Sequence, residues 1–190
     1  PILIGRREKI QEIIEENSLK LDSASIIDPR SDEEEERRVR YGKILYDKRM
    51  RNGLTALEAE RNMRQRNYFG AMMVETGEAD ALVSGLTRNF PNVIKPALHV
   101  IGKAEGVNKV AGMYILQTKQ GPMFFADTTV NVNPSAEEIV EITLLMAEVV
   151  RRLRIVPRIA LLSYSNFGSS KGEDAEKMAE AAKILHRDHP

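Results

Sequence analysis

The sequence predicts an α/β fold, built mostly from parallel strands that alternate with helices. Short apolar runs such as ILI at 2–4 and SII at 25–27 are followed by segments whose apolar residues recur at helical spacing. Gly, Pro and Asn separate these segments, as expected of turns. The runs at 109–117 and 122–126 are joined by a short turn with Gly121, which predicts one hairpin within the parallel order.

Capping residues mark several helix starts. Ser31 with Glu34, and Thr55 with Glu58, match the capping box, in which a hydroxyl and a carboxylate satisfy N–H groups at a helix start. Asn133-Pro134 predicts another start, with Asn as N-cap and Pro at the first helical position. With the apolar periodicity, these signals predict strands at 2–4, 25–27, 80–84, 109–117, 122–126 and 159–162, and helices near 6–17, 31–53, 55–63, 69–77, 91–103, 133–154 and 173–185.

The composition is that of a globular protein without a dominant charge. Of 190 residues, 28 are basic, 28 are acidic, and 42% are hydrophobic, so the chain has no overall basic field and no nucleic-acid partner is expected, although a local basic patch is compatible with the sequence. The absence of cysteine excludes a disulfide framework and a thiolate nucleophile, and it fits a cytoplasmic protein. The three histidines have no metal-ligand spacing, and no apolar run approaches the about 20 residues that cross a bilayer. We therefore expect neither a metal site nor a membrane partner.

No internal repeat or low-complexity linker divides the chain, so residues 1–190 are expected to form one domain. A two-lobed arrangement is compatible with the sequence, with lobe boundaries near 75–80 and 155. The chain opens directly on a strand and closes on a helix that runs almost to Pro190. We therefore expect it to be part of a larger fold.

Three loops share one design: each follows an apolar run, is rich in hydroxyl and amide side chains, and leads into a helix. They are SGLTRN at 84–89, DTTVNVN at 127–133 and SYSNFGSSKG at 163–172. Ligands of open α/β sheets bind beyond the carboxyl ends of strands, and helix N-termini favour phosphate, so the three loops together predict an anion-binding cleft. The residues that suit it are the donors Ser84, Thr87, Ser163 and Ser165, the glycine Gly85, and the cations Arg88, Lys95 and Lys171.

Each loop on its own also has a simpler interpretation. Ser, Asn and Gly are ordinary turn and cap residues, and Lys171 suits an exposed position. Two roles fit Asp127, a catalytic carboxylate or a cap at a strand end, and chemistry alone favours the cap. GSSKG at 168–172 lacks the spacing of a P-loop, so a nucleoside triphosphate is not expected.

Four segments, in the same order, resemble the phosphate acetyltransferase family. They are YDKRMRNGLTALEA, DALVSGLTRNFPNVIKPALHVIG, FFADTTVNVNPSAEE and LLSYSNFGSSKGEDAEK, and together they extend the resemblance over essentially the whole chain. Variant details such as SGLTRN and AGMY look most like the C-terminal domain of large bacterial NADP-dependent malic enzymes. The resemblance implies a three-layer αβα phosphotransacetylase fold, of the isocitrate/isopropylmalate dehydrogenase type, with two lobes and a cleft.

The resemblance also implies a ligand, acetyl-CoA or acetyl phosphate, and the residues that hold it. Arg49 takes the position proposed to hold phosphate, for which a guanidinium is suited. Lys95 stands where many members have arginine, which keeps the charge but loses the bidentate fork. The other matching positions are Ser84, Gly85, Asp127, Asn131, Asn133, Ser163 and Ser165. The family's proposed catalytic aspartate belongs to a later segment, so no catalytic residue is expected in this chain.

Three hypotheses follow from the resemblance. The first is the acetyl-CoA-binding regulatory and oligomerisation domain of a malic enzyme, whose upstream domain would use NADP and a divalent metal, Mg or Mn. The second is part of an active phosphate acetyltransferase, which forms acetyl phosphate and CoA from acetyl-CoA and phosphate. The third is an assembly domain with a vestigial cleft. We expect a homo-oligomer, at least a dimer.

Overall fold

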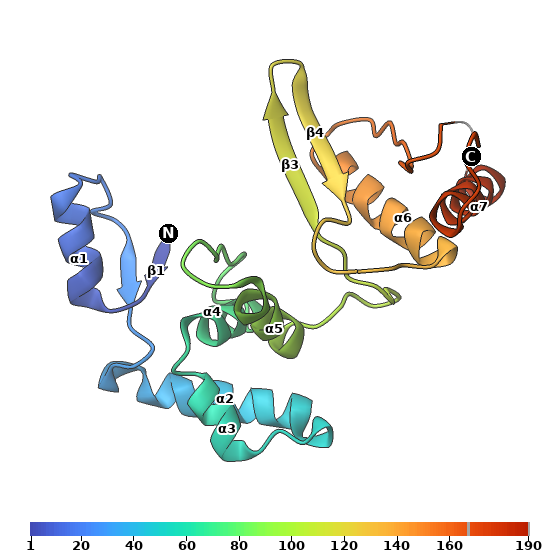
Figure 1. Cartoon of the computed structure of the whole chain (residues 1–190). Helices are drawn as coiled ribbons and strands as arrows, with labels where there is room; N and C mark the ends of the chain where they lie inside the picture. Colours follow the sequence, from blue (N-terminus) through green and yellow to red (C-terminus); the bar gives the residue numbers. More distant parts are fainter. Residues whose placement is uncertain (167, 190) are drawn as a thin grey trace. The chain divides into compact units, whose positions relative to one another are not determined.

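The computed structural model describes residues 1–166 and 168–189, and it divides into two compact units, Pro1–Gly102 and Lys103–Pro190 (Figure 1). Each unit has its own small sheet and its own helices, and each is described by itself. The lobe boundaries expected near 75–80 and 155 stay predictions.

The first unit begins with two parallel strands. β1 (Ile2–Ile4) pairs with β2 (Ser25–Ile27), and α1 (Arg7–Glu16) connects them. The Gly5 N–H extends this ladder by donating to the Ile27 carbonyl at 2.9 Å. The strand–helix–strand order is the one predicted, and it confirms the α/β class.

Helices form the rest of the first unit and enclose its core. Tyr41 and Leu45 lie opposite Phe69 and Met72, and all four are fully buried. The Tyr41 and Phe69 rings meet edge to face with centroids 5.2 Å apart. Met73 is also buried, so both neighbouring methionines fill the core, as predicted. The helices are α2 (Glu35–Arg49), α3 (Ala56–Asn62), α4 (Arg66–Glu75) and α5 (Phe90–Val100), and the 3₁₀ turns η1 (Asp32–Glu34) and η2 (Met50–Asn52) flank α2.

The second unit combines one hairpin with two helices. β3 (Met113–Thr118) and β4 (Gly121–Ala126) pair antiparallel, which confirms the predicted hairpin. α6 (Ala136–Arg152) packs against α7 (Glu173–Asp188) through a small apolar cluster that includes Ile139 and Val140 of α6. Figure 1 shows the hairpin and these two helices in yellow to red.

Of the two capping boxes predicted in the first unit, one forms and the other does not. Thr55 and Glu58 form the predicted box at the start of α3. Ser31 does not cap a helix, because its hydroxyl donates to the Asp28 carbonyl at 2.9 Å and a 3₁₀ turn begins there instead. The sequence pattern of a capping box therefore does not produce one at Ser31, because the Asp28 carbonyl binds the Ser31 hydroxyl.

The strands predicted at 80–84 and 159–162 do not form. Among the described residues, neither segment has a hydrogen-bonded partner strand, and Val83 and Leu162 are 96% and 71% exposed. A strand requires another backbone to satisfy its N–H and C=O groups, and apolar composition alone does not supply one. The predicted mostly parallel sheet and three-layer arrangement are not confirmed: the described sheets are β1–β2, parallel, and β3–β4, antiparallel.

Candidate functional site

The loop at residues 84–89, called the lip loop here, is the last part of the segment that connects α4 to α5 in the first unit. Gly85 has φ +144° and Leu86 has φ +54°, so the chain turns through two left-handed conformations in succession. A side chain at Gly85 would be strained, which gives the predicted glycine a conformational reason. Thr87 and Arg88 are exposed.

The N-terminus of α5 offers few free N–H groups to an anion. The Asn89 side chain caps the helix by accepting from the Asn92 N–H at 3.3 Å. Pro91 has no N–H and the Asn92 N–H is already bonded to the cap, so among the first three residues of the helix only the Phe90 N–H is free. The predicted phosphate cradle of backbone N–H groups is therefore not available at this helix.

The cations near the lip loop are better placed for an anion. Arg88 and Lys95 are both exposed, and within residues 1–166 and 168–189 neither forms an ion pair with a carboxylate. Any anion bound here would therefore be held by side-chain charges rather than by the helix N-terminus.

Arg49, the expected phosphate ligand, contacts the other end of α5. Its Nε donates to the His99 carbonyl at 2.7 Å, and its other guanidinium nitrogen donates to the Leu98 carbonyl. Lys48 joins it by donating to the Val100 carbonyl at 2.9 Å. Carbonyls at a helix C-terminus lack partners and carry partial negative charge, so these two cations stabilise the end of α5.

A second pair from α4 and α5 lies beside Arg49. The Tyr68 hydroxyl and His99 Nδ1 are 3.0 Å apart, and the Tyr68 side chain is almost fully buried. Burial lowers the pKa of His99, and the nearby charges of Lys95 and Arg49 lower it further. Burial also raises the pKa of Tyr68. His99 is therefore neutral at pH 7, and it lies on the same side of α5 as Lys95, as the four-residue spacing predicts.

Asn67, on the first turn of α4, is a residue that sequence reasoning missed. Its side-chain nitrogen donates to the Asn92 carbonyl at 2.8 Å, and its oxygen accepts from the Ser84 hydroxyl at 2.7 Å. It connects the lip loop to α5 across 17 and 25 residues of sequence. A lone asparagine within a helical pattern gave no signal of this role.

In the second unit, Asp127 organises the loop that follows β4. Its Oδ1 accepts from the N–H groups of Gly112, Thr129 and Val130 at 2.9, 3.1 and 3.2 Å. Its Oδ2 accepts from the Asn131 N–H at 2.7 Å and from the Asn131 side chain. The Asn131 side chain also donates to the Val110 carbonyl at 2.9 Å.

The environment of Asp127 fixes its charge. Burial alone would raise the pKa of this carboxyl, but the N–H groups of Thr129 and Gly112 and both donors of Asn131 lower it to about 2. The N–H groups of this loop thus bind the carboxylate of its own first residue. With its acceptors used and its pKa so low, Asp127 is unsuited to proton abstraction near pH 7.

Gly112 makes this arrangement possible and was not singled out as a site residue. A Cβ at this position would lie 2.4 Å from Thr129 Oγ1 and 3.2 Å from Asp127 Oδ1. The Asp127 loop can therefore pack this closely against residue 112 only because glycine has no side chain. An isolated glycine beside a strand pattern is the signal that could have found it.

The start of α6 corrects the predicted N-cap. Ser135, not Asn133, caps the helix, in a capping box with Glu138. The Asn133 side chain instead accepts from Lys177 Nζ on α7 at 2.6 Å. Ser135 is favoured as the cap because its hydroxyl accepts from the Glu138 N–H while the Glu138 carboxylate accepts from the Ser135 N–H, which completes both halves of the box.

The loop at 163–172 is held by its own serines. The Ser165 N–H donates to the Ser163 hydroxyl at 3.2 Å, and the Ser165 hydroxyl donates to the Ser170 carbonyl at 3.0 Å. Lys171 is exposed. The first turn of α7 carries Glu173, Asp174 and Glu176, whose charges oppose an anion at this helix start.

The candidate residues fall into two separate groups. Arg49, Ser84, Gly85, Thr87, Arg88 and Lys95 belong to the first unit, and Asp127, Asn131, Asn133, Ser163, Ser165 and Lys171 belong to the second. A cleft shared by all three loops stays a prediction.

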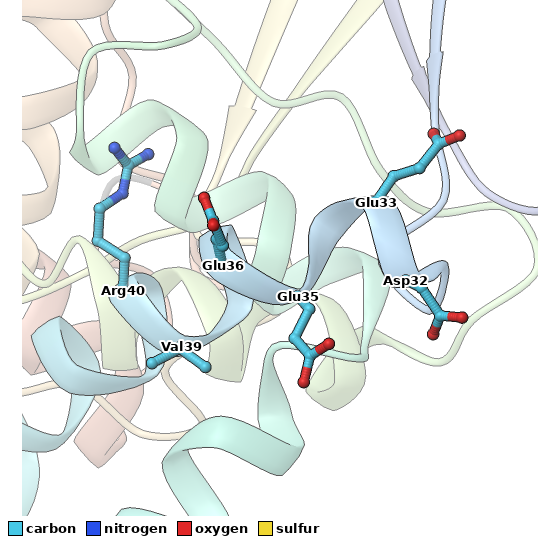
Figure 2. A pocket seen from close by; sticks show the side chains of 6 residues that line it. All are labelled: Asp32, Glu33, Glu35, Glu36, Val39 and Arg40. Carbon is cyan, nitrogen blue, oxygen red and sulfur yellow. The ribbon is translucent and has the colours of Figure 1, made fainter.

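A surface hollow in the first unit has the wrong charge for an anion. Figure 2 shows it along η1 and the start of α2, and none of the candidate residues lines it. Its lining residues are Asp32, Glu33, Glu35, Glu36, Val39 and Arg40.

Within residues 1–166 and 168–189, no group of three or more His, Asp or Glu side chains is arranged to hold a metal ion. No helix in this part of the chain is long and apolar enough to cross a membrane.

Fold and site together define an α/β domain whose exposed cations suit an anionic ligand. A family model described as phosphate acetyl/butaryl transferase matches residues 1–190. Phosphate acetyltransferase from Bacillus subtilis is 35% identical over 190 residues, covering 100% of this chain and 58% of that protein. NADP-dependent malic enzyme from Haemophilus influenzae is 38% identical over 191 residues, covering 100% of this chain and 25% of that protein.

A solved structure agrees with these matches. A phosphotransacetylase from Staphylococcus aureus superposes with a TM-score of 0.80 at 28% identity, covering 98% of this chain and 56% of its own. The chain belongs to the phosphate acetyl/butaryl transferase family. It spans 58% or less of the length of the relatives named above.

Proposed function

We propose that this chain is part of the acetyl-CoA-binding regulatory and oligomerisation domain of an NADP-dependent malic enzyme. Another domain of that cytoplasmic protein would convert malate to pyruvate and CO₂ with NADP and Mg or Mn. An acyl-CoA or related phosphate ligand would bind at the lip loop and shift the homo-oligomer toward a less active state. Such coupling requires that the ligand bind the two states with different affinities.

The observation that carries this proposal is the contrast between the cations and Asp127. Arg88 and Lys95 are exposed and, in the described part of the chain, form no ion pair, so they can contact phosphate groups. The Asp127 carboxylate is committed to five hydrogen bonds within its own loop. These features favour binding of an anion without transfer of a proton.

The similarity to malic enzymes supports the choice of parent protein. The malic enzymes of Haemophilus influenzae and Escherichia coli are 38% and 37% identical to this chain over its full length. The phosphate acetyltransferases of Bacillus subtilis and Clostridium acetobutylicum are 35% and 32% identical. The difference is small, and it agrees with the SGLTRN and AGMY variants.

The second candidate is part of an active phosphate acetyltransferase, and the TM-score of 0.80 to a solved phosphotransacetylase favours it. In that reaction the CoA thiolate attacks the carbonyl carbon of acetyl phosphate. The C–S bond of the thioester forms, the C–O bond to phosphate breaks, and inorganic phosphate leaves. Cations beside the transferring group would stabilise its negative charge.

Binding calorimetry on the complete protein tests the proposed ligand. We expect acetyl-CoA to bind, and Lys95→Gln to weaken binding about three- to tenfold through the loss of one charged contact. Lys43→Gln, which removes an exposed lysine of α2, is the matched control and should bind like the wild type. An absence of binding by acetyl-CoA, CoA and inorganic phosphate would favour an assembly domain instead.

A further inference from the structure

The lip loop has few contacts that fix its shape. Between Asp80 and Leu86, the described backbone makes no backbone hydrogen bond except that the Gly85 carbonyl accepts from Thr87. Leu86 is fully exposed, so it contributes no packing. Leu82 packs upstream of the loop, since a Cβ on Gly70 of α4 would lie 2.8 Å from its Cδ1. Asn89 caps α5 downstream. The contact of Ser84 with Asn67 therefore holds the backbone between Leu82 and Asn89.

Asn67 supplies that contact, and its amide orientation is determined by its neighbours. The side-chain NH₂ faces the Asn92 carbonyl at 2.8 Å, and the side-chain oxygen faces the Ser84 hydroxyl at 2.7 Å. The flipped amide would place two acceptor oxygens against each other at Asn92, which is unfavourable. The oxygen of Asn67 is thus directed toward the lip loop.

This orientation changes the role of Ser84. Its hydroxyl proton is donated to Asn67, so Ser84 has no proton left to donate to a phosphate oxygen. Ser84 was expected to contact the anion directly. In the described geometry it instead connects the lip loop to α4.

We propose that Asn67 is a positioning residue that, through Ser84, fixes the lip loop, and with it Arg88, for binding an acyl-CoA or phosphate anion. The role rests on the proposed function, because it requires the lip loop to bind an anion. Asn67 itself does not contact the ligand. It lowers the entropy that the loop must lose on binding.

A double-mutant cycle in the complete protein tests this role, with acetyl-CoA and inorganic phosphate as the probes. We expect Asn67→Ala and Ser84→Ala each to weaken binding about three- to tenfold, the range of one hydrogen bond. The double variant should be no weaker than Asn67→Ala alone, because the bond that Ser84→Ala removes is already absent in Asn67→Ala. Asn62→Ala is the control: Asn62 accepts only a local bond from Gln65 among the described residues, so binding should not change.

Hydrogen–deuterium exchange provides a readout that needs no ligand. We expect faster exchange at residues 84–89 in Asn67→Ala and wild-type exchange in Asn62→Ala. Wild-type affinity in Asn67→Ala, or fully additive effects in the double variant, would overturn the role of Asn67 alone. A wild-type protein that binds neither probe would overturn the proposed function, and with it the positioning role.

Discussion

At the scale of single residues, Asp127 lies in a motif of the family, and its carboxylate holds its own loop together. The aspartate follows β4 and precedes α6, where an active-site carboxylate would be expected. Its oxygens accept from three neighbouring backbone N–H groups on the loop and from the N–H of Gly112. Its charge is used to build the loop, which is the cap role that chemistry favoured in the sequence.

Replacing this carboxylate should destabilise the protein in a pH-dependent way. Asp127→Asn puts an NH₂ group against backbone N–H groups, which costs about 1–3 kcal/mol and lowers Tm by several degrees at pH 7. The folded pKa of about 2 lies below the ordinary value of 3.8, so the extra stability is present above pH 3.8 and is lost toward pH 2. The Tm deficit of the variant should therefore shrink on acidification.

Thermal unfolding of the complete protein between pH 7 and pH 3 measures this deficit. Asp22→Asn, at an exposed aspartate of the first unit, is the matched control and should leave Tm unchanged. A deficit that stayed constant over this range would contradict the role of the ionised carboxylate.

His99 should report the charges that surround it. Burial, then Lys95, then Arg49 lower its pKa below 6.5, so the histidine is neutral at pH 7 and its protonation on acidification is destabilising. We expect Lys95→Gln to raise this pKa, because one repelling charge is removed. Histidine hydrogen–deuterium exchange followed by mass spectrometry measures it, with Lys43→Gln as control. An equal His99 pKa in the wild type and Lys95→Gln would show that Lys95 does not act on it.

At the scale of elements, the end of α5 depends on the end of α2. Arg49 and Lys48 together contact three successive carbonyls, those of Leu98, His99 and Val100. This contact keeps α5, and therefore Lys95, in place relative to the core. The arginine that the family resemblance assigns to phosphate thus has a structural role in the described geometry.

Arg49→Gln separates these two roles. We expect a fall in Tm of about 2–4 °C for each kcal/mol lost at the carbonyls, because their charged donor is removed. Arg51→Gln removes an exposed arginine two residues further on, and it should leave Tm unchanged. A loss of acetyl-CoA affinity with no change in Tm would instead support Arg49 as a direct ligand.

The two capping patterns of the first unit allow a second matched test. Thr55→Ala removes an N-cap that is present, so Tm should fall by an amount equivalent to about 1 kcal/mol. Ser31→Ala removes a hydroxyl that does not cap a helix, so its effect should be smaller. Equal losses of Tm in the two variants would contradict the difference between these helix starts.

These elements also show which parts of the structure are predictable from sequence. Apolar periodicity predicted the helices, the first two strands and the hairpin, because the signal for each is local. The runs at 80–84 and 159–162 were assigned as strands on composition, but strand formation depends on a distant partner that composition does not reveal. The contacts of Asn67 span 17 and 25 residues and are invisible for the same reason.

At the scale of the whole molecule, the candidate residues are divided between the two units. The first unit carries the lip loop with Arg88 and Lys95, and the second carries the Asp127 loop. The related malic enzymes and acetyltransferases are longer proteins, of which this chain matches 25% to 58%. Regulation by an acyl-CoA, homo-oligomerisation and malate oxidation are therefore properties proposed for the complete protein.

The most direct test is the malate-dependent reduction of NADP by the complete protein, measured as acetyl-CoA is titrated. We predict inhibition that saturates with acetyl-CoA and that needs a higher concentration in Lys95→Gln than in Lys43→Gln. Malate oxidation that stays constant up to a large excess of acetyl-CoA would contradict the regulatory role. So would an absence of malate oxidation together with rapid, phosphate-dependent formation of acetyl phosphate, which would identify an acetyltransferase instead.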